Sequence, residues 1–175
     1  METKTVILCD DHNIVRAGLR QIVESFGDFE VLDDVASGEA LFPLFQKQVP
    51  DLLLLDISLP GRSGLEVLKQ IQSIYPQVAV LTLSMYPEEQ FAIRMIKAGA
   101  RGYLHKDSAP QVLEDAMRTI AEGKQFISAD LTRIMIEELA KDDNELPHKS
   151  LSDREYEVLL YIGEGKSMTD IANQL

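Results

Sequence analysis

The chain has a single cysteine, Cys9, and no tryptophan, and its apolar runs are all short. One thiol cannot form a disulfide within the chain or a metal site built on several cysteines, and it is typical of a reducing compartment. A membrane helix needs about 20 consecutive apolar residues, and the N-terminus lacks the basic region and apolar stretch of a secretory signal. We therefore expect a cytoplasmic protein that does not span or bind a membrane.

Basic residues are also scarce. The 175 residues include 17 Lys and Arg against 29 Asp and Glu, a formal net charge of −12. Broad affinity for nucleic acid depends mainly on basic side chains that meet phosphates, so this balance argues against it. Residues 129–175 carry half of the net charge, −6, and are the more acidic part per residue.

Two periodicities alternate along the first 125 residues. Short apolar runs, typical of strands buried on both faces of a parallel sheet, occur at 6–8, 31–32, 52–55, 78–83 and 103–104. Apolar residues three and four positions apart predict amphipathic helices over 14–26, 65–75, 91–96 and 112–120. This alternation of strand and helix predicts a doubly wound α/β fold with right-handed crossovers.

The rest of the chain predicts a helix over 129–140, a polar linker over 141–150 and two further helices. Ser152-Asp-Arg-Glu155 and Ser167-Met-Thr-Asp170 have the spacing of capping boxes, which satisfy backbone N–H groups at a helix N-terminus. In the first of these helices we expect inward-facing side chains at Tyr156, Val158, Leu159, Leu160 and Ile162. About 25 residues cannot bury an independent core, so we expect this part to be incomplete.

Polar residues follow the predicted strands and should meet at one edge of the sheet, where ligands of such folds gather. They are Asp10 and Asp11, Asp56 and Ser58, Ser84, and Lys106. Two carboxylates ~4 Å apart repel by roughly 4 kcal/mol at an effective dielectric near 20, so three need cations beside them. Lys106 supplies one charge, and Mg²⁺, which takes few protein oxygens, suits the rest. The same set suits chemistry through an aspartyl phosphate.

These residues belong to motifs that resemble the response regulators of two-component signalling, in the NarL/FixJ branch with a LuxR-type helix-turn-helix. The motifs are Cys-Asp-Asp-His at 9–12, Leu-Leu-Asp-Ile-Ser-Leu-Pro-Gly-Arg-Ser-Gly at 54–64, Leu-Ser-Met at 83–85, Ala-Gly-Ala-Arg-Gly-Tyr-Leu-His-Lys-Asp at 98–107 and Leu-Ser-Asp-Arg-Glu-Tyr-Glu-Val-Leu at 151–159. The resemblance implies a flavodoxin-like receiver, a five-stranded sheet of order 2-1-3-4-5, over 1–125. A linker helix and linker over 126–150 would follow, then the N-terminal part of an all-α DNA-binding domain over 151–175, without its recognition helix.

The resemblance also implies roles for the site residues. The metal ligands would be Asp11, Asp56 and the backbone carbonyl of Ser58, with Asp10 acting through water. The phosphoryl group would be accepted by Asp56 and contacted by Lys106 and Ser84, and Tyr103 would swing inward as Ser84 moves. We do not expect His12 or His105 to be metal ligands, because the carboxylates suffice for Mg²⁺.

The implied function is a two-component response regulator. A sensor histidine kinase would phosphorylate Asp56 in a Mg²⁺-dependent reaction, and phosphorylation would switch homodimerisation and DNA binding by the complete C-terminal domain to regulate transcription. The chain itself would not bind DNA specifically, since a helix-turn-helix reads bases with its recognition helix. One alternative is a stand-alone receiver that acts through protein partners only. An enzyme is not expected: phosphohydrolases with an Asp nucleophile usually place a second Asp two residues later, where this chain has Ser58.

Overall fold

The structure is a computed structural model that describes residues 3–140 and 151–174. Its centre is a five-stranded parallel sheet with the order β2-β1-β3-β4-β5. The strands are β1 (Lys4–Cys9), β2 (Phe29–Val35), β3 (Leu52–Asp56), β4 (Ala79–Ser84) and β5 (Gly102–His105). The predicted fold class and strand order are therefore confirmed.

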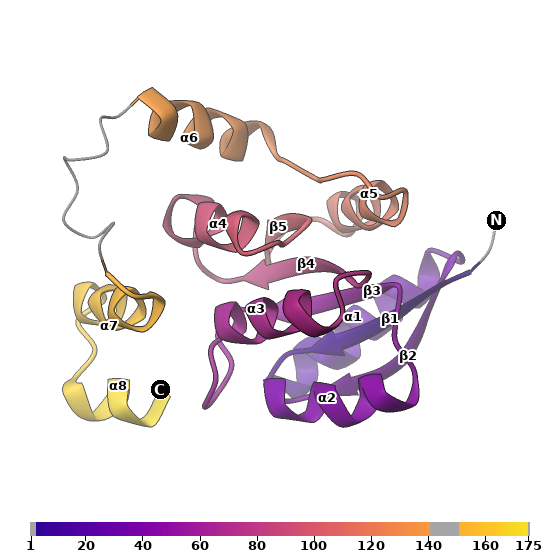
Figure 1. Cartoon of the computed structure of the whole chain (residues 1–175), viewed down its shortest axis with the longest axis horizontal. Helices are drawn as coiled ribbons and strands as arrows, with labels where there is room; N and C mark the ends of the chain where they lie inside the picture. The colour runs from indigo at the N-terminus through magenta and orange to yellow at the C-terminus, as the bar shows by residue number, and fades with distance from the viewer. Residues whose placement is uncertain (1–2, 141–150, 175) are drawn as a thin grey trace.

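Helices cover both faces of this sheet (Figure 1). They are α1 (Asn13–Ser25), α2 (Gly38–Lys47), α3 (Gly64–Ile74), α4 (Glu88–Lys97) and α5 (Pro110–Ala121). Buried side chains of α2, α3 and α4 share one core with the sheet, and those of α1 and α5 share another. The layered arrangement follows from strands that are apolar on both faces.

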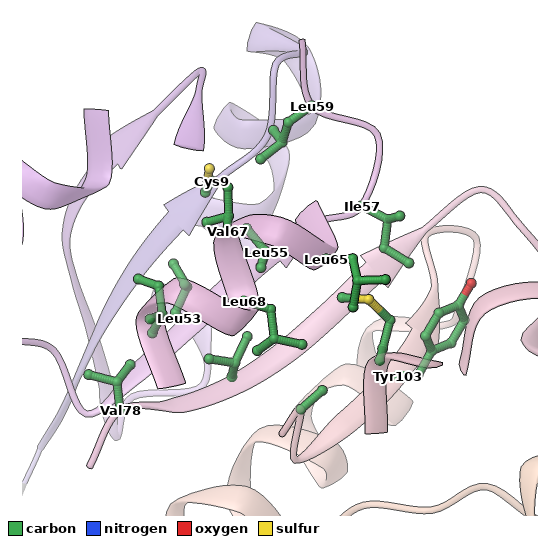
Figure 2. Close-up of a cluster of buried hydrophobic side chains, with 14 of the residues drawn as sticks. Cys9, Leu53, Leu55, Ile57, Leu59, Leu65, Val67, Leu68, Val78 and Tyr103 are labelled. Atoms are coloured by element: carbon green, nitrogen blue, oxygen red, sulfur yellow. The ribbon is translucent and has the colours of Figure 1, made fainter. Parts of the chain in front are cut away.

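Alternation along the central strands divides the side chains between these two cores. On β3, Leu53 and Leu55 belong to the core beneath α3, whereas Leu52 and Leu54 belong to the core beneath α5. Figure 2 shows the first core, in which side chains of α3 lie against those of the sheet. Because both faces of β1 and β3 are buried, these strands hold the residues that follow them in fixed positions.

The helix boundaries have local causes. Ser63 and Glu66 form a capping box at the start of α3, with both reciprocal hydrogen bonds present. Pro110 occupies the first turn of α5, where a missing N–H costs nothing. Helix α2 is not predicted from the sequence, and it contains Pro43, a residue that usually kinks or ends a helix.

Three helices follow the sheet: α6 (Ala129–Ala140), α7 (Asp153–Gly163) and α8 (Met168–Gln174). The helix predicted over 129–140 is confirmed, and α6 packs against α4. Both predicted capping boxes are present, at Ser152–Glu155 and at Ser167–Asp170. The predicted linker over 141–150 lies outside the described residues. None of the helices described is both long and apolar enough for a membrane span.

The inward face predicted for α7 is wrong in part. Leu159 and Ile162 are 45% and 52% exposed, and the side chains of α7 that are buried are Glu157 and Tyr161. The reason is that α7 lies beside α3 and α4 (Figure 1), and this contact selects a polar and aromatic face of the helix. Periodicity alone ranks apolar residues and cannot anticipate such a contact.

Candidate functional site

The sheet register brings the ends of the four strands that precede the predicted site together. Cys9 pairs with Leu55, Asp56 with Leu83, and Ser84 with His105. Residues that directly follow β1, β3, β4 and β5 therefore share one edge, as ligand-binding residues do in open parallel sheets.

Lys106 lies between two buried carboxylates at this edge. Its Nζ donates to Asp56 Oδ2 at 2.6 Å and is 2.7 Å from Asp10 Oδ2. Asp56 and Asp10 are almost completely buried, and the Lys106 side chain is 9% exposed. The Lys106 backbone N–H donates to the carbonyl of Ser84 at 2.8 Å, which fixes the start of the side chain against β4.

Burial acts in opposite directions on the pKa values of Asp56 and Lys106. Burial raises the pKa of Asp56, and the Asp10 charge adds to this effect, although Lys106 and the N–H of Ser58 oppose it. Burial acts to lower the pKa of Lys106, but the two carboxylates outweigh it and the pKa is raised. Lys106 therefore stays protonated, as a group that must neutralise an anion requires.

Four side chains at this edge lie close enough together to share one metal ion. Asp10, Asp11, His12 and Asp56 offer one ligand atom each within 4.8 Å of one another. The buried Asp11 Oδ1 accepts no hydrogen bond from the described residues, and Asp10 Oδ2 lies 2.7 Å from the Lys106 ammonium. Their charged neighbours are Lys106 and His12. Carboxylate oxygens gathered in this way fit a hard divalent ion such as Mg²⁺.

The two histidines that flank the cluster differ in position. The Nδ1 of His12 is 2.6 Å from Asp11 Oδ1 and 3.5 Å from Asp10 Oδ1, so this ring lies at the acidic cluster. The ring of His105 contacts the carbonyl of Met85 instead, at 2.8 Å. Neither histidine is predicted to be a metal ligand, and the place of His12 directly after Asp11 in the motif at 9–12 is the signal for its position at the cluster.

Ser58 and Gly64 shape the loop after β3. The Ser58 N–H donates to Asp56 Oδ1 at 3.0 Å, and the Gly64 N–H donates to the carbonyl of Ile57 at 2.9 Å. A Cβ atom at Gly64 would lie 2.3 Å from the backbone oxygen of Asp56, closer than any real contact. The absence of a side chain at Gly64 therefore allows this loop to fold back against the end of β3.

The predicted switch residues Ser84 and Tyr103 both contact Tyr86, which is not among the predicted site residues. Ser84 and Tyr103 are fully buried, so Tyr103 points inward in this structure. Ser84 Oγ accepts the N–H of Tyr86 at 2.9 Å, and the Tyr103 hydroxyl donates to the carbonyl of Tyr86 at 2.8 Å. Tyr86 thus links the two, and its place two residues after Ser84 was the available signal.

Known proteins share this architecture. Residues 6–118 match the family described as the response regulator receiver domain. The response regulator UvrY of Escherichia coli (strain K12) is 33% identical over 171 residues, which cover 97% of this chain and 78% of UvrY. A two-component response regulator of the LuxR family from Aurantimonas sp. SI85-9A1 has a TM-score of 0.74 and 31% identity, over 80% of this chain and all of that one.

A further solved structure extends over the C-terminal helices. RcsB from Salmonella enterica serovar Typhimurium, bound to promoter rprA in the presence of phosphomimetic BeF3−, has a TM-score of 0.71 and 27% identity. The match covers 97% of this chain and 82% of RcsB. These relatives are regulators, not enzymes.

The sheet and its acidic edge define a receiver of two-component signalling. The chain belongs to the response regulator receiver family and, from its relatives, to the two-component response regulators of the LuxR family.

Proposed function

We propose that this chain accepts a phosphoryl group on Asp56 from a sensor histidine kinase in a Mg²⁺-dependent reaction. The observation that carries the proposal is the position of Lys106, which holds its ammonium between Asp56 and Asp10, beside a group of acidic ligand atoms that lie within 4.8 Å of one another. A nucleophilic carboxylate beside a fixed cation and an open set of hard ligands is what phosphoryl transfer to Asp requires.

Each residue of the site would have a separate role in phosphoryl transfer. A carboxylate oxygen of Asp56 forms a bond to phosphorus as the bond to the donor breaks, and Lys106 neutralises charge on the transferred group. Asp11, Asp56 and the Ser58 carbonyl would hold Mg²⁺, with Asp10 acting through water. When bound, Mg²⁺ supplies charge neutralisation for the phosphoryl oxygens.

Ser84 and Tyr103 are the proposed switch. Ser84 would hydrogen-bond the phosphoryl group, and its movement would release the N–H of Tyr86, which Ser84 Oγ now accepts at 2.9 Å. Tyr86 also lies near the C-terminal helices, because, besides burial, the neighbouring Tyr161 hydroxyl on α7 contributes to the raised pKa of Tyr86. A movement of Ser84 would therefore alter the contacts of α7 with the receiver.

Contacts between α4 and α7 support this route. The Tyr156 hydroxyl donates to the carbonyl of Gln90 at 2.9 Å, and the Tyr156 ring lies edge-to-face against Phe91. Asp153 Oδ1 accepts from Arg94 at 3.0 Å. The residues of α4 directly follow the loop that contains Ser84 and Tyr86. A shift of α4 would therefore disturb its contacts with α7.

We propose that this coupling controls homodimerisation and the binding of DNA by the complete C-terminal domain, and thereby transcription. The RcsB relative bound to a promoter supports this part. We retain the division into a receiver over 1–125, a linker over 126–150 and the beginning of a DNA-binding domain over 151–175.

Intact-protein mass spectrometry tests the proposal. The chain is incubated with acetyl phosphate in the presence of Mg²⁺ or of a chelator, beside Asp56→Asn and the matched control Asp107→Asn, which changes an exposed carboxylate next to Lys106. We expect a gain of one phosphoryl group in the wild type and the control, with Mg²⁺ only. The same gain in Asp56→Asn would remove Asp56 as the acceptor.

A further inference from the structure

The guanidinium of Arg16 on α1 binds the loop that contains Asp10 and Asp11. Arg16 donates through one terminal nitrogen to the backbone carbonyl of Asp10 at 2.5 Å and through the other to the side chain of Asn13. Its Nε donates to Asp34 Oδ1 on β2 at 2.9 Å. The Arg16 side chain is only 12% exposed, so these bonds are largely shielded from water.

Asp34 gives Arg16 a charged and immobile anchor. Its second oxygen, Oδ2, accepts from Arg20 at 2.8 Å. The hydrogen bond from Arg20, joined by that from Arg16, lowers the pKa of Asp34 although burial opposes the shift. The carboxylate therefore stays ionised, and its two oxygens hold two arginines that lie one turn apart on α1.

The contact with Asp10 places the acidic residues. The Asp10 N–H donates to the carbonyl of Val35 at 3.1 Å, so the bond from Arg16 fixes the other side of the same residue. The carbonyl that Arg16 holds belongs to the peptide that joins Asp10 to Asp11. The orientation of this peptide sets the direction in which the Asp11 side chain leaves the loop.

We propose that Arg16, anchored by Asp34, is a positioning residue that sets Asp10 and Asp11 in place for the divalent cation. The inference rests on the proposed function, because it concerns the same metal site. Groups that orient metal ligands without touching the metal typically contribute 10- to 100-fold to metal affinity. Electrostatics alone predicts the opposite sign, since loss of a nearby positive charge favours binding of a cation.

The test is Mg²⁺ titration by isothermal calorimetry on the unphosphorylated full chain. Arg16→Met keeps most of the side-chain volume and removes the contact with the loop. Arg20→Met is the matched control, since Arg20 bonds the same Asp34 and the carbonyl of Val31 but not the loop. We expect a Kd about tenfold higher in Arg16→Met and within about twofold of the wild type in Arg20→Met.

Phosphorylation kinetics give a second readout. In Arg16→Met the Mg²⁺ concentration for half-maximal phosphorylation by acetyl phosphate should rise by the same factor, with the rate at saturating Mg²⁺ unchanged. A role in folding alone would lower the melting temperature of both arginine variants and leave this concentration unmoved.

The outcomes separate the two proposals. Equal affinities of Arg16→Met and Arg20→Met overturn the positioning role and leave the proposed function standing, whereas a wild type that binds no Mg²⁺ overturns both. If Arg16→Met does not fold, Asp34→Asn replaces it, because this change keeps Arg16 but removes its charged anchor. We then expect a Kd about threefold higher, and an unchanged Kd overturns the inference.

Discussion

Replacing Lys106 with methionine removes the positive charge from the centre of the acidic site and keeps most of the side-chain volume. Nζ lies 2.6 Å from Asp56 Oδ2 and 2.7 Å from Asp10 Oδ2, and both carboxylates are almost completely buried. Loss of one partner of a buried ion pair leaves a charge without compensation and costs about 3–5 kcal/mol. Because Lys106 faces two such carboxylates, we expect Lys106→Met to lower the free energy of unfolding by about 4 kcal/mol without Mg²⁺.

The loss should depend on pH with a definite sign. Burial raises the pKa of Asp56, and Lys106 opposes that shift, so the variant raises this pKa further. A carboxyl group whose pKa is higher in the folded than in the unfolded state favours folding when it is protonated. The deficit of Lys106→Met relative to the wild type is therefore full above the raised pKa and shrinks as the pH falls through it.

Urea unfolding of both proteins with a chelator, at neutral pH and near pH 5, measures the effect. Added Mg²⁺ should stabilise the variant more than the wild type, since it returns cationic charge to the same carboxylates. A neutral-pH difference below about 1 kcal/mol, or a deficit that grows as the pH falls, would refute the assignment of Lys106 as the counter-ion of this site.

Two other substitutions test the loop after β3 and the contacts of α7 with α3 and α4. Gly64→Ala places a Cβ 2.3 Å from the backbone oxygen of Asp56, and such overpacking costs about 1–3 kcal/mol. We expect a lower melting temperature and slower phosphorylation by acetyl phosphate, and a variant equal to the wild type in both would contradict the reading of this loop. Asp153→Asn weakens the ion pairs of α7 with Arg94 and Lys69, which together contribute about 1 kcal/mol. Hydrogen–deuterium exchange over residues 153–163 should become faster while that of β1 and β3 is unchanged, and identical exchange over α7 would count against its docking.

The sheet and the acidic residues at its edge could be predicted from the sequence because they depend on local pattern. Runs such as Leu52 to Leu55 identify strands buried on both faces, and the residue after such a strand must lie at the carboxyl end of the sheet. Asp56 and Lys106 needed no further information to be placed together. The strand order came from the family resemblance, since periodicity does not specify which strands are neighbours.

The remaining features depend on contacts between distant parts of the chain. Arg16 donates to the carbonyl of Asp10 and to Asp34 on β2 at the same time. This arrangement depends on how α1 packs against β2, which no spacing in the sequence predicts. The buried face of α7 includes Glu157, which a hydrophobic pattern would place in solvent. Burial raises the pKa of Glu157, and Arg154 on the same helix opposes this shift.

Chemical trapping tests the central claim, that Asp56 carries the phosphoryl group, most directly. The chain is treated with acetyl phosphate and Mg²⁺ and reduced with borohydride, which converts an aspartyl phosphate to homoserine, and its peptides are sequenced by mass spectrometry. We expect homoserine at position 56 in the treated wild type, and none in untreated protein or in Asp56→Asn. Homoserine at position 10 or 11 instead, or unmodified aspartate at all three positions of a folded sample, would contradict it.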